Sequence, residues 1–125
     1  LWLVTSGGAR FARLTDNGDD IAPVWTPDGN SVYFMNISRS GNWDLYHIEI
    51  GDAPRLLQPT RFASSDANEV LPAVSPDGSA IAFLSERGGR WQIWVAPING
   101  GEAILLGDIE GKIVDPTQQS MQWVR

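Results

Sequence analysis

The sequence of 125 residues has no cysteine and a single histidine, His47. Disulfides and thiolate metal sites are therefore excluded, and a catalytic zinc site, which uses three protein ligands, would lack histidines. A Ser-His-Asp triad would have to use His47, and no Gly-x-Ser-x-Gly nucleophile elbow is present. A calcium-loop motif is also missing. We therefore expect an ordinary mid-strand His47, no catalytic residue, no cofactor and no metal site.

Long apolar runs and basic clusters are missing too. No apolar run approaches the roughly 20 residues of a membrane-spanning helix. The 9 basic and 15 acidic residues give a net charge of −6. An acidic chain without a basic run repels phosphates, so we expect neither nucleic-acid binding nor membrane insertion. Six tryptophans and 42% apolar residues exclude a disordered chain and predict a packed core.

A four-residue turn sequence occurs twice and marks an internal repeat. Thr26-Pro27-Asp28-Gly29 and Ser75-Pro76-Asp77-Gly78 lie 49 residues apart, and each is followed by an apolar run and then by a tryptophan, Trp43 or Trp91. Proline sets the φ of the second turn position, aspartate accepts hydrogen bonds from the turn, and glycine takes the left-handed conformation. A repeat of this length made of short apolar runs is typical of a β-propeller blade.

The repeat predicts an all-β fold, a partial β-propeller with two complete four-stranded blades plus partial blades at both ends. Each complete unit ends at a leucine pair, Leu56-Leu57 or Leu105-Leu106. We expect strands at 22–26, 31–36, 43–50 and 54–58, and again at 71–75, 80–85, 91–98 and 103–107. The corresponding division is the end of a first blade at 1–15, complete blades at 16–58 and 59–107, and the first strand of a further blade within 108–125.

Three further expectations follow from these segments. Little helix is expected, because no window has a 3.6-residue apolar period. Pro23 and Pro72 lack an amide hydrogen, so they are expected at the starts of their strands. The segment 91–98 is apolar on both faces, which fits blades stacked face to face, whereas the alternative fold, an irregular β-sandwich, would alternate apolar and polar residues.

The order Pro-x-Trp-Ser/Thr-Pro-Asp-Gly, Ile/Val-x-Phe, Arg-x-Gly-x-Trp-x-Ile/Leu-Tyr/Trp resembles the WD-repeat-like propeller repeat of TolB and its bacterial relatives. The resemblance covers nearly the whole chain and departs where Val74 replaces the strand tryptophan. It implies a non-catalytic scaffold that binds a protein or peptide, in the periplasm or outside the cell. The alternative is the substrate-gating propeller portion of a prolyl oligopeptidase-like serine peptidase whose catalytic domain is absent from this chain.

Candidate binding residues lie where non-repeated loops join the blades. The segment 60–68 is longer than its counterpart, and length without repeat constraint is where binding function tends to be placed. The predicted rim site comprises Asp19, Asp20, Arg61, Asp66, Asn68, Glu69 and Asp115.

Two pairs of repeated residues have structural interpretations. Asp20 and Glu69 occupy equivalent positions, which favours a scaffold role. The equally repeated Arg39 and Arg87 are expected to pair with a blade carboxylate or to stack on an aromatic ring. Because two blades cannot close a ring, we also expect the chain to associate with itself or with the remainder of a parent propeller.

Overall fold

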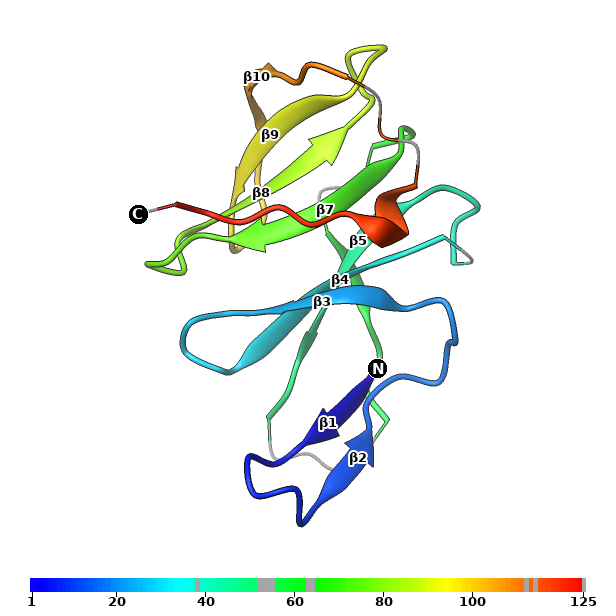
Figure 1. The fold of residues 1–125 in the computed structure, drawn as a ribbon, viewed down its shortest axis with the longest axis vertical. Helices are drawn as coiled ribbons and strands as arrows, with labels where there is room; N and C mark the ends of the chain where they lie inside the picture. The colour runs from blue at the N-terminus through cyan, green and yellow to red at the C-terminus, as the bar shows by residue number, and fades with distance from the viewer. Residues whose placement is uncertain (38, 52–55, 63–64, 112, 114, 125) are drawn as a thin grey trace.

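The computed structural model describes residues 1–37, 39–51, 56–62, 65–111, 113 and 115–124, and its strands form antiparallel sheets (Figure 1). A two-stranded hairpin comes first, made of β1 (Trp2–Val4) and β2 (Phe11–Arg13). Two four-stranded sheets follow, each with its strands adjacent in chain order. They consist of β3 (Ile21–Trp25), β4 (Ser31–Asn36), β5 (Asp44–Glu49) and β6 (Thr60–Phe62), and of β7 (Glu69–Val74), β8 (Ala80–Ser85), β9 (Gln92–Pro97) and β10 (Ile104–Asp108).

Little helix is present, as expected. The 3-10 helix η1 (Pro116–Gln118) is the only helix among the residues that the structure describes. A meander of four strands per sheet, repeated along the chain, is the construction of propeller blades. The predicted fold class, part of a β-propeller, is therefore confirmed.

The two Pro-Asp-Gly turns have the geometry that their sequence predicts. Gly29 and Gly78 both have a φ of 73°. In each turn the carboxylate of the aspartate, Asp28 or Asp77, accepts two hydrogen bonds. One comes from the hydroxyl of the residue that precedes the proline, at 2.6 Å. The other comes from the backbone amide of the residue that follows the glycine, at 3.0 Å. The turns therefore close the β3–β4 and β7–β8 hairpins identically.

Pro23 and Pro72 lie inside β3 and β7 rather than at the strand starts that we expected. The pairing register shifts between Ile21 and Val24 and between Val70 and Ala73, so each proline lies at a β-bulge. A bulge interrupts the ladder and tolerates the missing amide hydrogen. The residues before the prolines, Ala22 and Leu71, have φ values of 52° and 56°. The strands β3 and β7 therefore carry the same local backbone strain at equivalent positions.

The outer strand of the first complete blade is not where the leucine pair placed it. Residues 56–58 are outside any strand, residues 54–55 lie outside the described part, and the fourth strand is β6 at Thr60–Phe62. The amide of Leu57 donates to the carbonyl of Leu14 at 2.7 Å, so this segment bonds to the preceding hairpin instead. Phe62, 5% exposed, faces the core. The strand expected at 54–58 is therefore wrong for residues 56–58, because the repeat does not determine which of two neighbouring segments pairs with β5.

The first complete blade is buried on both faces. This observation favours stacked blades over the alternative fold, an irregular β-sandwich, whose sheets would each have one face in solvent. One face contributes Tyr33 and Leu45 to a cluster shared with Val70 and Phe83 of the next blade. The other face contributes residues such as Phe34 to a second cluster, against which Leu1 and Leu3 of the first hairpin pack. The two complete blades meet along β7, which contacts β3, β4 and β5.

The segment after η1 runs across the second complete blade (Figure 1). The indole nitrogen of Trp123 donates to the carbonyl of Ala73 on β7 at 2.8 Å. None of the described residues after Asp108 lies in a strand. A further blade beginning within 108–125 therefore stays a prediction.

Candidate functional site

Two rims flank the sheets. The rim that carries the loops between blades and the loops between second and third strands is called here the loop rim. The opposite one, with the two Pro-Asp-Gly turns and the β9–β10 loop, is the turn rim. In Figure 1 the loop rim faces right and the turn rim faces left. The predicted site residues lie on or beside the loop rim, whereas a cavity of about 540 Å³ lies beside the turn rim, with residues of both Pro-Asp-Gly turns in its lining.

Two repeated ion pairs hold the loop rim together. Arg39 Nη2 lies 3.1 Å from Asp20, and Arg87 pairs with Glu69. The side chains of Asp20 and Glu69 are both fully buried. The guanidinium of Arg87 also lies 4.8 Å from the ring centre of Trp94. The expected pairing and ring stacking of the repeated arginines is confirmed, and the scaffold role of the two buried carboxylates is supported.

Arg61 belongs to a third ion pair, which the repeat did not indicate. Its Nη2 donates to the carboxylate of Asp44 at 2.8 Å and to the carbonyl of Ser65 at 2.9 Å. Its hydrogen bond to Asp44 raises the pKa of Arg61, so the guanidinium stays charged. Asp44 is fully buried and also accepts from the hydroxyl of Ser40. Arg61 is therefore tied to the scaffold through a buried carboxylate.

Glu69 is the most perturbed acid of the rim. Burial raises its pKa to about 7, and the negative charge of nearby Asp44 contributes to this increase. Hydrogen bonds from Ser65 and Arg87 act in the opposite direction and lower the pKa. One carboxylate oxygen, Oε2, is buried without a hydrogen-bond partner among the described residues. The raised pKa is therefore consistent with the geometry, since one oxygen of the ionised group would go unsolvated.

The remaining predicted residues divide between a loop anchor and exposed carboxylates. Asn68 links the blades, because its Oδ1 accepts from the amide of Trp43 at 3.0 Å and its Nδ2 donates to Glu86 at 2.8 Å. Asp19, Asp66 and Asp115 are exposed. The carboxylate of Asp115 caps η1 by accepting from the amide of Thr117, which lowers its pKa. Residues 63 and 64 of the long loop lie outside the described residues.

Chemically, the loop rim presents negative charge to solvent. Three of its arginines are held by the buried acids Asp20, Asp44 and Glu69. A fourth, Arg90 of the β8–β9 loop, is itself exposed and pairs with the exposed Asp108 at the end of β10. The exposed acids of its loops have no such partner in the ion pairs of the described residues. These exposed acids are Asp16, Asp19, Asp66, Glu110 and Asp115.

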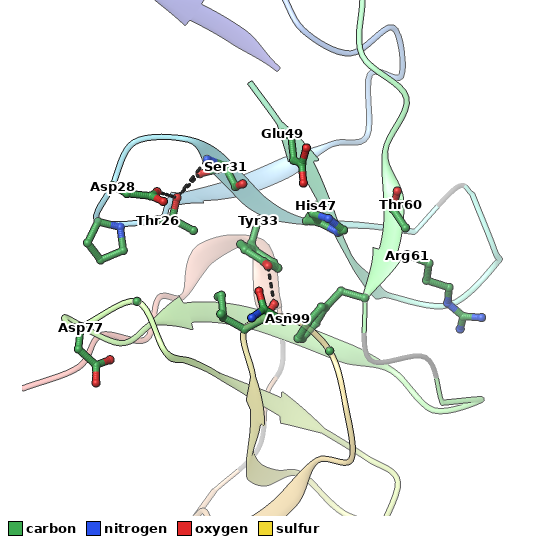
Figure 2. A pocket seen from close by; sticks show the side chains of 15 residues that line it. Thr26, Asp28, Ser31, Tyr33, His47, Glu49, Thr60, Arg61, Asp77 and Asn99 are labelled. Carbon is green, nitrogen blue, oxygen red and sulfur yellow. Dashed lines mark hydrogen bonds between the residues drawn. The ribbon is translucent and has the colours of Figure 1, made fainter. Parts of the chain in front are cut away.

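A cavity of about 540 Å³ lies between the two complete blades and was not anticipated from the sequence. Figure 2 shows Tyr33 and His47 side by side in it, with Asn99 of the neighbouring blade below Tyr33. The Tyr33 and His47 rings stack with their centres 5.4 Å apart, and the hydroxyl of Tyr33 donates to the carbonyl of Ile98 at 2.8 Å. Tyr33 and Ile98 are far apart in sequence, so no local motif could have revealed this site.

His47 Nδ1 is buried beside the cavity without a hydrogen-bond partner among the described residues. Within the same part of the chain, no group of three potential metal-ligating side chains is found. The described helix is not of a length or hydrophobicity that could span a membrane.

Comparisons with known proteins agree with this architecture. The model of the TolB β-propeller domain family matches residues 3–121. An uncharacterized protein of Agrobacterium fabrum is 30% identical over 86% of this chain and 35% of its own length. A Tol-Pal system protein TolB of Anaeromyxobacter dehalogenans is 33% identical over 89% of this chain and 24% of its own length. The solved structure of a putative TolB from Agrobacterium tumefaciens superposes with a TM-score of 0.60 at 29% identity, covering 72% of this chain and 32% of that chain.

Proposed function

The chain belongs to the TolB β-propeller domain family, and from that premise we propose that it is a non-catalytic binding module for a protein or peptide partner. It spans about a third or less of the curated relatives that it matches. A relative named for the Tol-Pal system favours a role in protein assembly and a periplasmic location for this chain as well. The proposal concerns the surface that this stretch of propeller contributes.

We assign the partner surface to the loop rim. Three arginines of the rim are bound to buried acids, and the exposed Arg90 is bound to Asp108. The observation that carries the assignment is the negative charge that remains: Asp19, Asp66 and Asp115 face solvent and have no ion-pair partner among the described residues. An exposed acidic surface attracts a basic partner and steers its approach, mainly through the association rate and with strong salt dependence. A basic segment of a partner protein is therefore the chemistry that this surface fits.

The test is a selection of phage-displayed random peptides on the purified chain, followed by affinity measurements on the enriched sequences. We expect enrichment of lysine- and arginine-rich peptides. In the Asp19→Lys, Asp66→Lys double variant we expect their affinity to fall by about tenfold or more, and added salt to weaken binding to the parent chain. Glu69→Lys is a poor probe, because its side chain is buried and the variant would disturb folding.

The matched control is Glu102→Lys, which reverses an exposed charge in the β9–β10 loop of the turn rim. This variant should bind the selected peptides within about twofold of the parent chain. Peptides that bind the double variant and the parent chain equally would show that the loop rim is not the partner surface. Turnover of peptide or ester substrates by the parent chain, abolished by replacing His47, would overturn its non-catalytic nature.

A further inference from the structure

The inter-blade cavity is large enough for a small ligand and is separate from the surface proposed above. Its volume of about 540 Å³ lies within the range of roughly 300–1,000 Å³ typical of small-molecule sites. Tyr33, His47 and Phe62 line it from the first complete blade, and Ile98, Asn99 and Gly100 from the second. A second cavity of about 400 Å³ shares His47, Glu49 and Thr60 with it. Both complete blades are thus needed to form the site.

Hydrogen-bond acceptors dominate the polar lining. Because Tyr33 donates its hydroxyl proton to the carbonyl of Ile98, the lone pairs of its oxygen are left for donors from a ligand. Burial and the charge of Glu49 raise the pKa of Tyr33, so the phenol stays neutral. Glu49 itself is an exposed carboxylate on the wall of the cavity. A ligand that brings donors would therefore find acceptors on two sides.

The charge around the cavity is negative. Asp28 and Asp77 line it, and the hydroxyl and amide hydrogen bonds within their turns lower the pKa of both carboxyls, so both are ionised. Arg61 is the arginine among the lining residues, but its guanidinium is bound to Asp44 and to the carbonyl of Ser65. Figure 2 shows the Arg61 side chain pointing away from the other lining residues. The field inside therefore favours a cation.

The aromatic walls add a second property that suits an organic cation. Tyr33 stacks on His47 with an interplanar angle of 20°, and Phe62 meets Tyr33 edge-on with ring centres 5.3 Å apart. Aromatic rings attract ammonium and guanidinium groups within about 6 Å.

We propose that the inter-blade cavity binds the ammonium or guanidinium group of an organic cation, with Glu49 as its counter-ion and Tyr33 and Phe62 as its aromatic wall. The cation is either a free small molecule or a basic side chain of a bound peptide. The two sources share the same head-group chemistry, and the experiment separates them.

The experiment is an NMR titration of the full chain, monitored at the backbone amides of Thr60, Asn99 and Gly100. The probes are N-acetylarginine amide and its neutral, nearly isosteric counterpart N-acetylcitrulline amide. We expect the arginine probe to shift these amides and to bind about tenfold or more tightly than the citrulline probe. A blocked Gly-Gly-Arg-Gly-Gly peptide that binds more tightly than the arginine probe would assign a peptide-borne cation, and equal affinity would assign a free small cation.

Two charge-neutralising variants locate the site. Glu49→Gln should weaken the arginine probe by about fivefold or more, whereas Glu102→Gln, which removes an exposed charge outside the cavity, should leave its affinity within about twofold. Asp66→Lys on the loop rim should leave the affinity of the arginine probe unchanged. The titration therefore tests the cavity independently of the peptide selection, which tests the loop rim. Equal binding of the arginine and citrulline probes, shifts confined to other residues, or no shift at tens of millimolar probe would overturn the proposal.

Discussion

Replacing Gly78 by valine tests whether the Pro-Asp-Gly turns are built on their left-handed glycines. Gly78 has a φ of 73°, and a Cβ there would meet only ring atoms of Pro27 at 3.5 and 3.7 Å, which is ordinary contact. The cost is therefore a backbone cost, about 1–2 kcal/mol for a residue with a Cβ, reduced by up to about 1 kcal/mol because valine also restricts the unfolded chain. A β-branched side chain resists this conformation more than alanine does.

We therefore expect Gly78→Val to lose about 0.5–1.5 kcal/mol in free energy of unfolding, measured by urea denaturation. Gly29→Val should lose as much, since Gly29 has the same φ of 73° with no atom within 4 Å of a Cβ. The control is Gly107→Val, at a glycine of β10 without a positive φ and with open space around it, where the change should stay below about 0.5 kcal/mol. Denaturation curves for Gly78→Val that coincide with those of the parent chain, or an equal loss at Gly107, would refute the reasoning.

Three further predictions concern pH and assembly. Because burial raises the folded-state pKa of Glu69 from 4.5 to about 7, the contribution of this group to stability is greatest below pH 4.5 and is lost as the pH rises to about 7; stability measured across this window should decline in the parent chain but not in Glu69→Gln, and equal slopes would contradict it. Hydrogen bonds from Ser75 and Ser79 lower the pKa of Asp77 from 3.8 to about 2, so its stabilising contribution is present above pH 3.8 and is lost as the pH falls to about 2; the stability difference between the parent chain and Asp77→Asn should shrink over that range. Trp2, Phe11 and Ile104 are 62%, 73% and 64% exposed, so light scattering should show concentration-dependent self-association, and a strictly monomeric chain at high concentration would show that these surfaces do not associate.

The fold was predictable because the sequence of one blade occurs twice in the chain. Turn chemistry, apolar runs and the tryptophans after the second strands recur together, so strands β4 and β8 begin and end where the repeat placed them. The pairing of Arg39 and Arg87 with blade carboxylates was predictable for the same reason. Residues that recur at equivalent positions are those that every blade requires in order to fold, so the repeat identifies them.

Features that occur once were beyond that reasoning. The position of β6 is one such feature. Either of two neighbouring segments could pair with the edge of β5; in the structure Thr60–Phe62 does so, and the amide of Leu57 donates to the carbonyl of Leu14 instead. The cavity depends on contacts between blades, such as that between Tyr33 and Ile98. His47 was expected to be an ordinary strand residue, and it does pair directly with Tyr33 across β4 and β5 of one blade. That this pair lines a cavity closed by Ile98 and Asn99 of the neighbouring blade depends on contacts between blades, which the sequence does not specify.

The most direct test of the loop rim as the partner surface is hydrogen–deuterium exchange of the parent chain with and without a selected basic peptide. If the exposed acids of the loop rim bind the peptide, amides around Asp19 and Asp66 should gain protection, while those of the turns at 26–29 and 75–78 should not. Protection confined to the two Pro-Asp-Gly turns and the β9–β10 loop, with no change around Asp19 and Asp66, would contradict the assignment of partner binding to the loop rim.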